Sequence, residues 1–204
     1  ERHPTCPINA YGETKLAVER ALGHFERAYG TRSIALRYFN AAGSDPDGEL
    51  GEEHRPEVHL IPRAIEAVLG GDALQVFGAD YPTPDGTCLR DYIHVSDLAR
   101  AHVLALARLE AGGASGVFNL GIGTPFSVQD VISSVERVSG SHVPVEHAPR
   151  RPGDPGVLFA SNDRIRTELG WQPEFVDLDA IVASAWAWRQ AHPNGYLEEA
   201  GSGQ

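Results

Sequence analysis

"AYGETKLAVERALGHFERAYGTRSIALRYFN", residues 10–40, joins two patterns that together decide the fold class. Its first part places apolar residues at helical spacing between charged ones, which predicts a helix over 11–29 with Gly30 as its C-terminal stop. Its second part is an apolar run rich in β-forming residues, which predicts a strand over 33–40. A helix that leads directly into a strand is typical of an α/β protein.

The alternation continues through the rest of the chain. Beyond a long polar loop at 41–57, Ser96 is predicted to cap the helix that follows it. Strands that alternate with helices predict an α/β fold with largely parallel strands. The predicted strands are 73–78, 89–95, 116–121 and 142–149, and the predicted helices are 59–69, 97–109, 127–140, 162–171 and 178–192.

The composition restricts the possible partners and compartments. With 17 basic and 28 acidic residues the net charge is −11, which disfavours nucleic acids and anionic membranes because both would repel the surface. No segment approaches the run of about 18 apolar residues that a membrane helix needs, and none has the pattern of a signal peptide. Cys6 and Cys88 lie far apart and form neither a disulfide framework nor a metal-ligand cluster. The sequence therefore predicts a cytoplasmic protein without a metal site.

A tyrosine and a lysine stand four residues apart near the start of the first helix. Lys15 is the only lysine among the 17 basic residues, and it shares a helix face with Tyr11. Such a pair suits proton transfer at a hydroxyl group, because a phenol titrates near pH 10 and needs a neighbouring cation to act as a base at about pH 7. An isolated pair of this kind is also typical of a surface tyrosine packed on a lysine stem, and the pair alone does not separate the two readings.

The wider sequence resembles a known enzyme family. "NAYGETK", "ALRYFNAAGSDPDG", "YPTPDGTCLRDYIHVSDLA" and "HPNGY" resemble, in order and over residues 3–197, the nucleotide-sugar epimerases of the extended short-chain dehydrogenase/reductase family. The resemblance implies the C-terminal part of a Rossmann-like doubly wound parallel sheet with a smaller α/β substrate-binding domain. It places the end of the NAD-binding domain at 1–45, the nucleotide-sugar domain mainly at 46–197 with segments near 88–120 returning to the Rossmann sheet, and a tail at 198–204.

The resemblance also implies residue roles and the cofactor NAD. In this family Tyr11 would take the proton from the sugar 4-hydroxyl while its hydride passes to NAD, and Lys15 would order the nicotinamide ribose. Phe39 would meet the nicotinamide end. The matching UDP-sugar residues are Asn40, His59, Leu60, Gln75, Phe77, Arg90, Arg151, Asp154 and Leu158. Without the resemblance, these are equally typical of strand core, surface ion pairs and turns, and His94 is typical of a core histidine with no chemistry.

Among these matches Arg90 and Arg151 would hold the diphosphate, a task that suits forked guanidinium groups. Gln75 and Phe77 would flank the uracil, and Asp154 would hold ribose hydroxyls. Leu158 occupies a position that controls room for an N-acetyl group in the family, and the tolerance of N-acetylated sugars stays open.

The expected activity is the NAD-dependent interconversion of UDP-glucose and UDP-galactose through a 4-keto intermediate, in a complete protein that is a homodimer. Alternatives are another epimerase, dehydratase or decarboxylase of the same family, or a non-catalytic UDP-sugar-binding module. The chain lacks methionine and a glycine-rich dinucleotide fingerprint, since "GIGTPF" at 121–126 has Phe126 at the third glycine position. A preceding segment with most of the NAD half is therefore expected, and the chain alone is predicted to be inactive.

Overall fold

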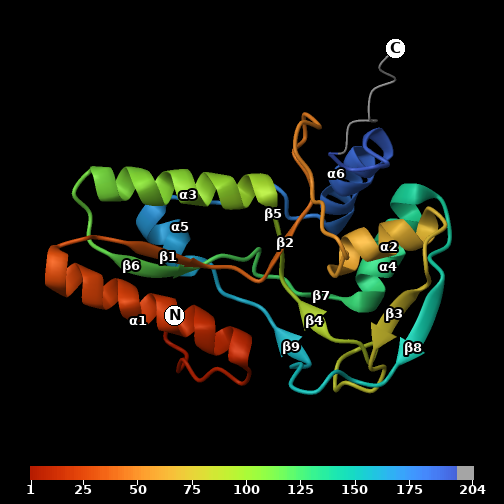
Figure 1. The fold of residues 1–204 in the computed structure, drawn as a ribbon, viewed down its shortest axis with the longest axis horizontal. Helices are drawn as coiled ribbons and strands as arrows, with labels where there is room; N and C mark the ends of the chain where they lie inside the picture. Colours follow the sequence, from red (N-terminus) through yellow and green to blue (C-terminus); the bar gives the residue numbers. More distant parts are fainter. Residues whose placement is uncertain (197–204) are drawn as a thin grey trace, which may run out of the picture.

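The computed structural model describes residues 1–196 and has a mixed α/β fold built on parallel strand pairs (Figure 1). The tail predicted for 198–204 lies outside the described residues. The helices are α1 (Ala10–Tyr29), α2 (Leu60–Val68), α3 (Val95–Glu110), α4 (Val128–Ser139), α5 (Asp163–Leu169) and α6 (Leu178–Ala191). The strands are β1 (Ile34–Arg37), β2 (Asn40–Ala42), β3 (Leu74–Phe77), β4 (Leu89–Arg90), β5 (Tyr92–His94), β6 (Gly116–Asn119), β7 (Phe126–Ser127), β8 (Val145–Ala148) and β9 (Val157–Leu158).

Helix α1 and strand β1 confirm the predicted helix-to-strand order, but the strand predicted over 33–40 is wrong in its length. Strand β1 ends at Arg37, and Asn40 begins β2, which pairs with β5 instead of β6. The Asn9 side chain accepts a hydrogen bond from the Gly12 amide and caps the helix start. Gly30 ends the helix at a φ of 69°, a left-handed conformation that glycine adopts without a steric penalty. The helix that carries Tyr11 and Lys15 is therefore fixed at both ends by its own sequence.

Strand β1 pairs in parallel with β6, and helices cover both faces of this pair (Figure 1). Helix α1 lies on one side, while α3 and α5 pack on the other. Glu19 on α1 accepts two hydrogen bonds from the Arg37 guanidinium of β1, at 2.6 and 2.5 Å. This fork-to-carboxylate pair ties the helix to its sheet.

The prediction of one continuous strand over 89–95 is wrong, because the chain is divided at Asp91 into two strands, β4 and β5. Strand β5 pairs in parallel with β2, whereas β4 joins β7 and β9 in a separate sheet. The Asp91 carboxylate is 1% exposed and accepts hydrogen bonds from the amides of Ile122 and Ala160. Its carbonyl accepts from both the amide and the side chain of Asn40. Asp91 therefore directs the chain from one sheet into the next.

Two hydrophobic clusters form the core, and β5 lies between them. One cluster joins β5, β6, α3 and α5, and the other joins α2, β3, α4 and α6. Consecutive residues Tyr92 and Ile93 belong to different clusters, since side chains alternate across a strand. The β3–β8 pair lies beside the second cluster. The domain boundaries proposed from the sequence remain predictions.

The residue that caps the start of α3 also differs from the prediction. Its cap is His94 rather than the predicted Ser96, because Nδ1 of His94 accepts from the Ser96 amide at 3.1 Å. The ring is fully buried and stacks on Phe175 with centroids 3.8 Å apart. Ser184 Oγ donates to the Ile181 carbonyl, so Nε2–H of His94 donates to Ser184 Oγ. The hydrogen bonds thus fit the neutral ring, and the prediction of a core histidine is confirmed.

Burial lowers the pKa of His94, while the nearby carboxylates of Asp97 and Asp45 oppose that shift. In the unfolded chain the ring takes up a proton near its ordinary value of about 6.5, so the free energy of unfolding should fall as the pH drops through that value. We expect His94→Asn, which keeps a capping acceptor, to show a smaller loss of stability between about pH 8 and pH 5.5 in urea unfolding.

The matched control is His147→Asn, which removes an exposed histidine from β8 and should keep the wild-type pH dependence. An unchanged pH dependence in His94→Asn would contradict the buried neutral ring.

Candidate nucleotide-sugar site

A cavity of about 450 Å³ lies between β3, β4, the start of α2 and the segment before β9. Its walls combine apolar side chains with two arginines that the sequence singled out, Arg90 and Arg151. The cavity gathers all but one of the residues predicted to bind a UDP-sugar. They are Asn40, His59, Leu60, Gln75, Phe77, Arg90, Arg151 and Asp154.

Arg90, Arg151 and Asp154 are the charged residues of this cavity that the sequence singled out. Arg90 on β4 is 13% exposed in its side chain and forms an ion pair with Asp154, whose side chain is 30% exposed. The Arg151 guanidinium carbon lies 3.8 Å from the centroid of the Phe77 ring. Arg63 and Glu57 also line the cavity, so three guanidinium groups face two carboxylates and leave a net positive site, which suits a diphosphate. The aromatic face of Phe77 suits a planar base.

Asn40 and the start of α2 form the opposite wall. Nδ2 of Asn40 donates to the Asp91 carbonyl at 2.9 Å, so the turn at Asp91 fixes this side chain. His59 precedes the first residue of α2, Leu60, and no side chain caps the helix amides there. Uncapped amides at a helix N-terminus suit anionic groups such as phosphates.

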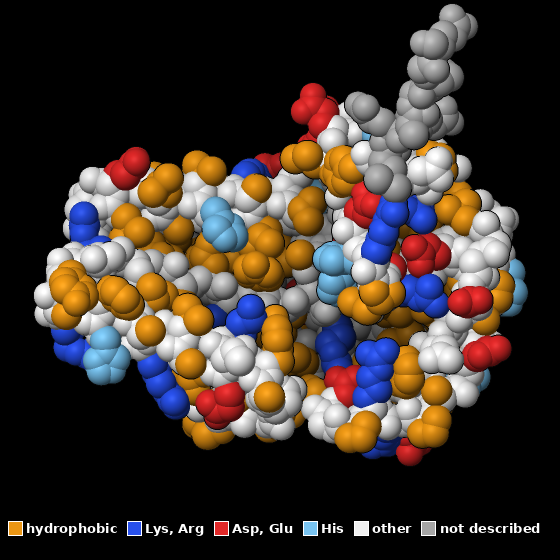
Figure 2. Space-filling view, in the orientation of Figure 1, with side chains coloured by type: hydrophobic (Ala, Val, Ile, Leu, Met, Phe, Trp, Pro, Cys, Tyr) orange, Lys and Arg blue, Asp and Glu red, His pale blue; other side chains and the backbone are white. Residues whose placement is uncertain are grey.

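The tyrosine and lysine pair lies outside this cavity, on the exposed first turns of α1. The Lys15 ammonium lies 5.0 Å from the centroid of the Tyr11 ring, and Tyr11 is 71% exposed. Phe39, in the bend between β1 and β2, does not line the cavity either. Figure 2 shows a hollow between α1 and the lobe that carries β3, β4 and β9, with Lys and Arg side chains at its edge. In residues 1–196 the two predicted sets of side chains thus lie on separate elements.

Leu158 is the remaining predicted substrate residue. It lies on β9 opposite Arg90 in the strand register and is 39% exposed, but it is not among the residues that line the cavity. Its role in the choice of sugar stays a prediction.

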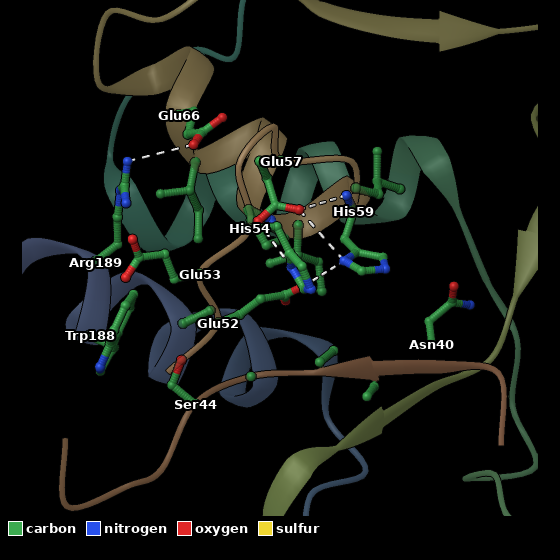
Figure 3. A pocket seen from close by; sticks show the side chains of 18 of the residues that line it. Asn40, Ser44, Glu52, Glu53, His54, Glu57, His59, Glu66, Trp188 and Arg189 are labelled. Carbon is green, nitrogen blue, oxygen red and sulfur yellow. Dashed lines mark hydrogen bonds and ion pairs between the residues drawn. The ribbon is translucent and has the colours of Figure 1, made fainter. Parts of the chain in front are cut away.

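A second cavity of about 650 Å³ adjoins the first (Figure 3). Asn40, Glu57, His59, Leu60 and Tyr92 line both. The sequence did not identify this cavity, whose other walls come from the loop after β2 and from α6, through residues such as Ser44, Glu52, Glu53, His54, Trp188 and Arg189 (Figure 3).

Four side chains on its wall, Glu52, His54, Glu57 and His59, are close enough together to hold a cation, although the sequence predicted no metal site. The signal that could have identified them is the spacing E-x-H-x-x-E-x-H within one loop. Burial raises the pKa of Glu52, and the neighbouring Glu57 carboxylate raises it further, while the His59 and His54 rings oppose the shift.

The candidate NAD-binding residues of the described chain could contact only the nicotinamide end of the cofactor. Tyr11 and Lys15 present exposed polar groups on α1 that could reach a ribose and a sugar hydroxyl. A glycine-rich turn at a helix start, which would hold the pyrophosphate, is missing from the helix N-termini of residues 1–196. The described part of the chain therefore fits one end of the dinucleotide.

Comparison with known proteins places these features in a family. A model described as the NAD dependent epimerase/dehydratase family matches residues 1–121, more than half of the chain. A UDP-glucose 4-epimerase of Halalkalibacterium halodurans is 51% identical over 200 residues, which cover 98% of this chain and 60% of that protein. A UDP-glucose 4-epimerase of Azospirillum brasilense is 53% identical over 192 residues, covering 94% of this chain and 55% of that protein. The chain thus spans between half and two thirds of the length of these relatives.

Solved structures agree with the observed fold. A crystal structure of a UDP-glucose 4-epimerase matches with a TM-score of 0.92 at 48% identity, covering 97% of this chain and 60% of that one. The UDP-glucose 4-epimerase of Bifidobacterium longum, solved in complex with NAD⁺ and UDP, matches with a TM-score of 0.90 at 38% identity, covering 96% of this chain and 59% of that one. The predicted Rossmann-like α/β fold class is confirmed. None of the helices in residues 1–196 is long and apolar enough to cross a membrane.

The two cysteines offer a test of the first cavity. Cys88 is buried and lines the cavity, whereas Cys6 is exposed. Burial raises the pKa of the Cys88 thiol, and the Arg90 cation offsets only part of this rise. Since the thiolate is the reactive species, iodoacetamide should alkylate Cys6 well before Cys88, as mass spectrometry of the digested chain would record.

Addition of UDP should slow the alkylation of Cys88 further and leave Cys6 unchanged. A Cys88 thiol that reacts as fast as Cys6, with or without UDP, would contradict this description of the cavity.

Proposed function

The chain belongs to the NAD dependent epimerase/dehydratase family, and we propose on that premise that it carries the UDP-sugar site and the proton-transfer pair of a UDP-glucose 4-epimerase. The complete protein would interconvert UDP-glucose and UDP-galactose with NAD as its cofactor. A homodimer and a cytoplasmic location are part of this proposal.

The observation that carries the proposal is the gathering of separate sequence segments around one cavity. Arg90, Arg151 and Phe77 come from β4, the segment before β9 and β3, yet all three line the same cavity. Two guanidinium forks beside an aromatic ring and an uncapped helix start match the parts of a nucleoside diphosphate. A chance cluster of surface arginines would not also include an aromatic ring, the size of a base, beside one of its guanidinium groups.

Each residue has a distinct task in the proposed binding mode. Arg90 and Arg151 would hold the diphosphate, while Phe77 would pack against the uracil. Asp154 would accept hydrogen bonds from ribose hydroxyls, and its ion pair with Arg90 keeps both side chains in place before the ligand arrives. Asn40, fixed by the Asp91 carbonyl, would reach the phosphates from the opposite wall.

The proposed chemistry begins at the sugar hydroxyl on C4. Tyr11, as a phenolate stabilised by the charge of the Lys15 ammonium, would accept the hydroxyl proton and become a neutral phenol. NAD, when bound, would supply reversible hydride transfer at C4. Tyr11 would return the proton, so the reaction leaves no net oxidation.

The choice of glucose and galactose over other sugars rests on the sequence. The stretch "YPTPDGTCLRDYIHV" at 81–95 and the closing "HPNGY" at 192–196 favour this activity over uronate epimerases, decarboxylases and 4,6-dehydratases. In that closing segment the ring centroids of Tyr196 and Trp188 lie 5.4 Å apart. The Tyr196 hydroxyl accepts a hydrogen bond from the Gly51 amide and donates one to the Gly51 carbonyl. The segment thus supports the loop that lines the second cavity.

Binding of UDP by this chain tests the cavity. We expect isothermal titration to detect UDP binding and little or no NAD binding, because the glycine turn for the pyrophosphate is missing from the sequence given. Replacement Arg151→Ala should weaken UDP binding about 10- to 100-fold, the loss expected when charged hydrogen bonds to phosphate are removed.

Arg166→Ala, which removes an exposed arginine from α5 outside the cavity, should leave UDP binding unchanged. Equal losses in the two variants would mean that net charge, rather than the cavity, binds UDP.

Removal of the Tyr11 hydroxyl tests the proposed role of this residue in proton transfer. In the longest protein encoded by the gene that carries this chain, Tyr11→Phe should lower kcat for UDP-galactose by about 10²- to 10⁴-fold, as expected for loss of a general base. Tyr29→Phe at the other end of the same helix should keep full activity, since that exposed residue lies far along α1. A Tyr11→Phe variant that is as active as the parent would rule out the role. The chain alone should show no conversion.

A further inference from the structure

Four side chains from one loop converge on a point at the wall of the second cavity (Figure 3), and two of them, Glu57 and His59, also line the first cavity. Glu52, His54, Glu57 and His59 lie between the end of β2 and the start of α2, and each presents one nitrogen or carboxylate oxygen to the others. These ligand atoms all lie within 4.8 Å of one another. The nucleotide-sugar function assigns a role only to His59.

The separations between these atoms match those around a small cation. Nδ1 of His59 lies 2.5 Å from Oε1 of Glu52 and 3.5 Å from Oε1 of Glu57. Nδ1 of His54 lies 3.1 Å from Oε1 of Glu52 and 3.8 Å from Oε2 of Glu57. A tetrahedral ion with ligands at about 2.1 Å separates neighbouring ligand atoms by about 3.4 Å. The four distances lie on both sides of this value.

The charge of the group favours a cation. Among the described residues, the ion-pair partners recorded for Glu52 and Glu57 are the two histidines and no arginine or lysine. Arg55, the nearest arginine in sequence, pairs with Glu53 instead. With neutral imidazoles, the group therefore carries two negative charges that a divalent ion would neutralise.

Glu57 is held in place before any ion arrives. Its side chain is only 5% exposed, and its Oε1 accepts hydrogen bonds from the amides of Val58 and His59 at 2.7 and 2.8 Å. Its Oε2 faces His54 at a distance too long for a hydrogen bond. A buried carboxylate with one oxygen bonded and the other directed at an imidazole is oriented as a ligand.

Both histidine side chains are about half exposed to solvent. Their side chains are 51% and 50% exposed, and the rings pack edge to face with centroids 5.0 Å apart. Small rotations of these exposed rings would bring both Nδ1 atoms to coordination distance while Glu57 stays fixed. An ion could therefore enter from the solvent side of the cavity.

We propose that Glu52, His54, Glu57 and His59 form a binding site for a divalent first-row transition metal ion, with Zn²⁺ as the best fit. Two imidazole nitrogens and two carboxylate oxygens match the ligand preference and coordination number of Zn²⁺. Mg²⁺ and Ca²⁺ require more ligands, nearly all of them oxygen, and fit this set poorly. The proposal is independent of the catalytic function, because none of its evidence involves UDP-sugar chemistry.

The test is metal binding by the chelator-treated chain, measured by isothermal titration with Zn²⁺ and by the visible spectrum with Co²⁺. We expect one Zn²⁺ per chain, intense d–d bands of tetrahedral Co²⁺, and much weaker binding of Mg²⁺. The variants His54→Asn and Glu57→Gln should each lower the Zn²⁺ affinity at least about tenfold. Glutamine keeps the acceptor for the Val58 and His59 amides, so the loop should keep its conformation, which circular dichroism and thermal unfolding would verify.

His142→Asn is the matched control. Nδ1 of His142 also lies 2.5 Å from a carboxylate, that of Glu136, but this exposed pair stands alone on the surface. Its loss should leave Zn²⁺ binding unchanged. Failure of the wild-type chain to bind Zn²⁺, an octahedral Co²⁺ spectrum, or equal effects of His54→Asn and His142→Asn would each overturn the proposal, whatever the outcome for UDP.

Discussion

The buried Asp91 side chain is the constraint on which the rest of the structure depends. Its carboxylate accepts the amides of Ile122 and Ala160, and its carbonyl receives two hydrogen bonds from Asn40. Burial raises the pKa of this carboxyl, and the donated amides oppose that shift. Each buried amide left without its acceptor would cost about 1–3 kcal/mol, so the loss of this one side chain would release two distant segments together.

Gly121 shows how tightly the turn is packed. A Cβ at this position would lie 2.1 Å from Oδ2 of Asp91, which leaves no room for any side chain. By changing the direction of the chain here, Asp91 places Arg90 in the cavity on one side and sends Tyr92 and Ile93 into the two hydrophobic clusters on the other. The position of Arg90 in the cavity and the packing of both cores therefore depend on one hydrogen-bonded turn.

The helices and most strands could be predicted from the sequence, because periodicity and local caps such as Gly30 act over a few residues. The division of the strand at Asp91 could not, since its bonding partners lie 31 and 69 residues further along the chain. His94 as a cap was missed for a related reason: its tautomer is set by Ser184 on α6. The predicted substrate residues came from a resemblance to a family. Their gathering into one cavity, like the cluster of histidines and glutamates, depends on the folded chain.

We expect the cavity between β3, β4 and the start of α2 to receive the UDP part of a nucleotide sugar. The most direct measurement is a crystal structure of the chain with UDP. We expect the diphosphate between Arg90 and Arg151, with the uracil against Phe77 and the ribose hydroxyls at Asp154. UDP bound in the second cavity beside Trp188, or in the first cavity without contact to either arginine, would contradict this expectation.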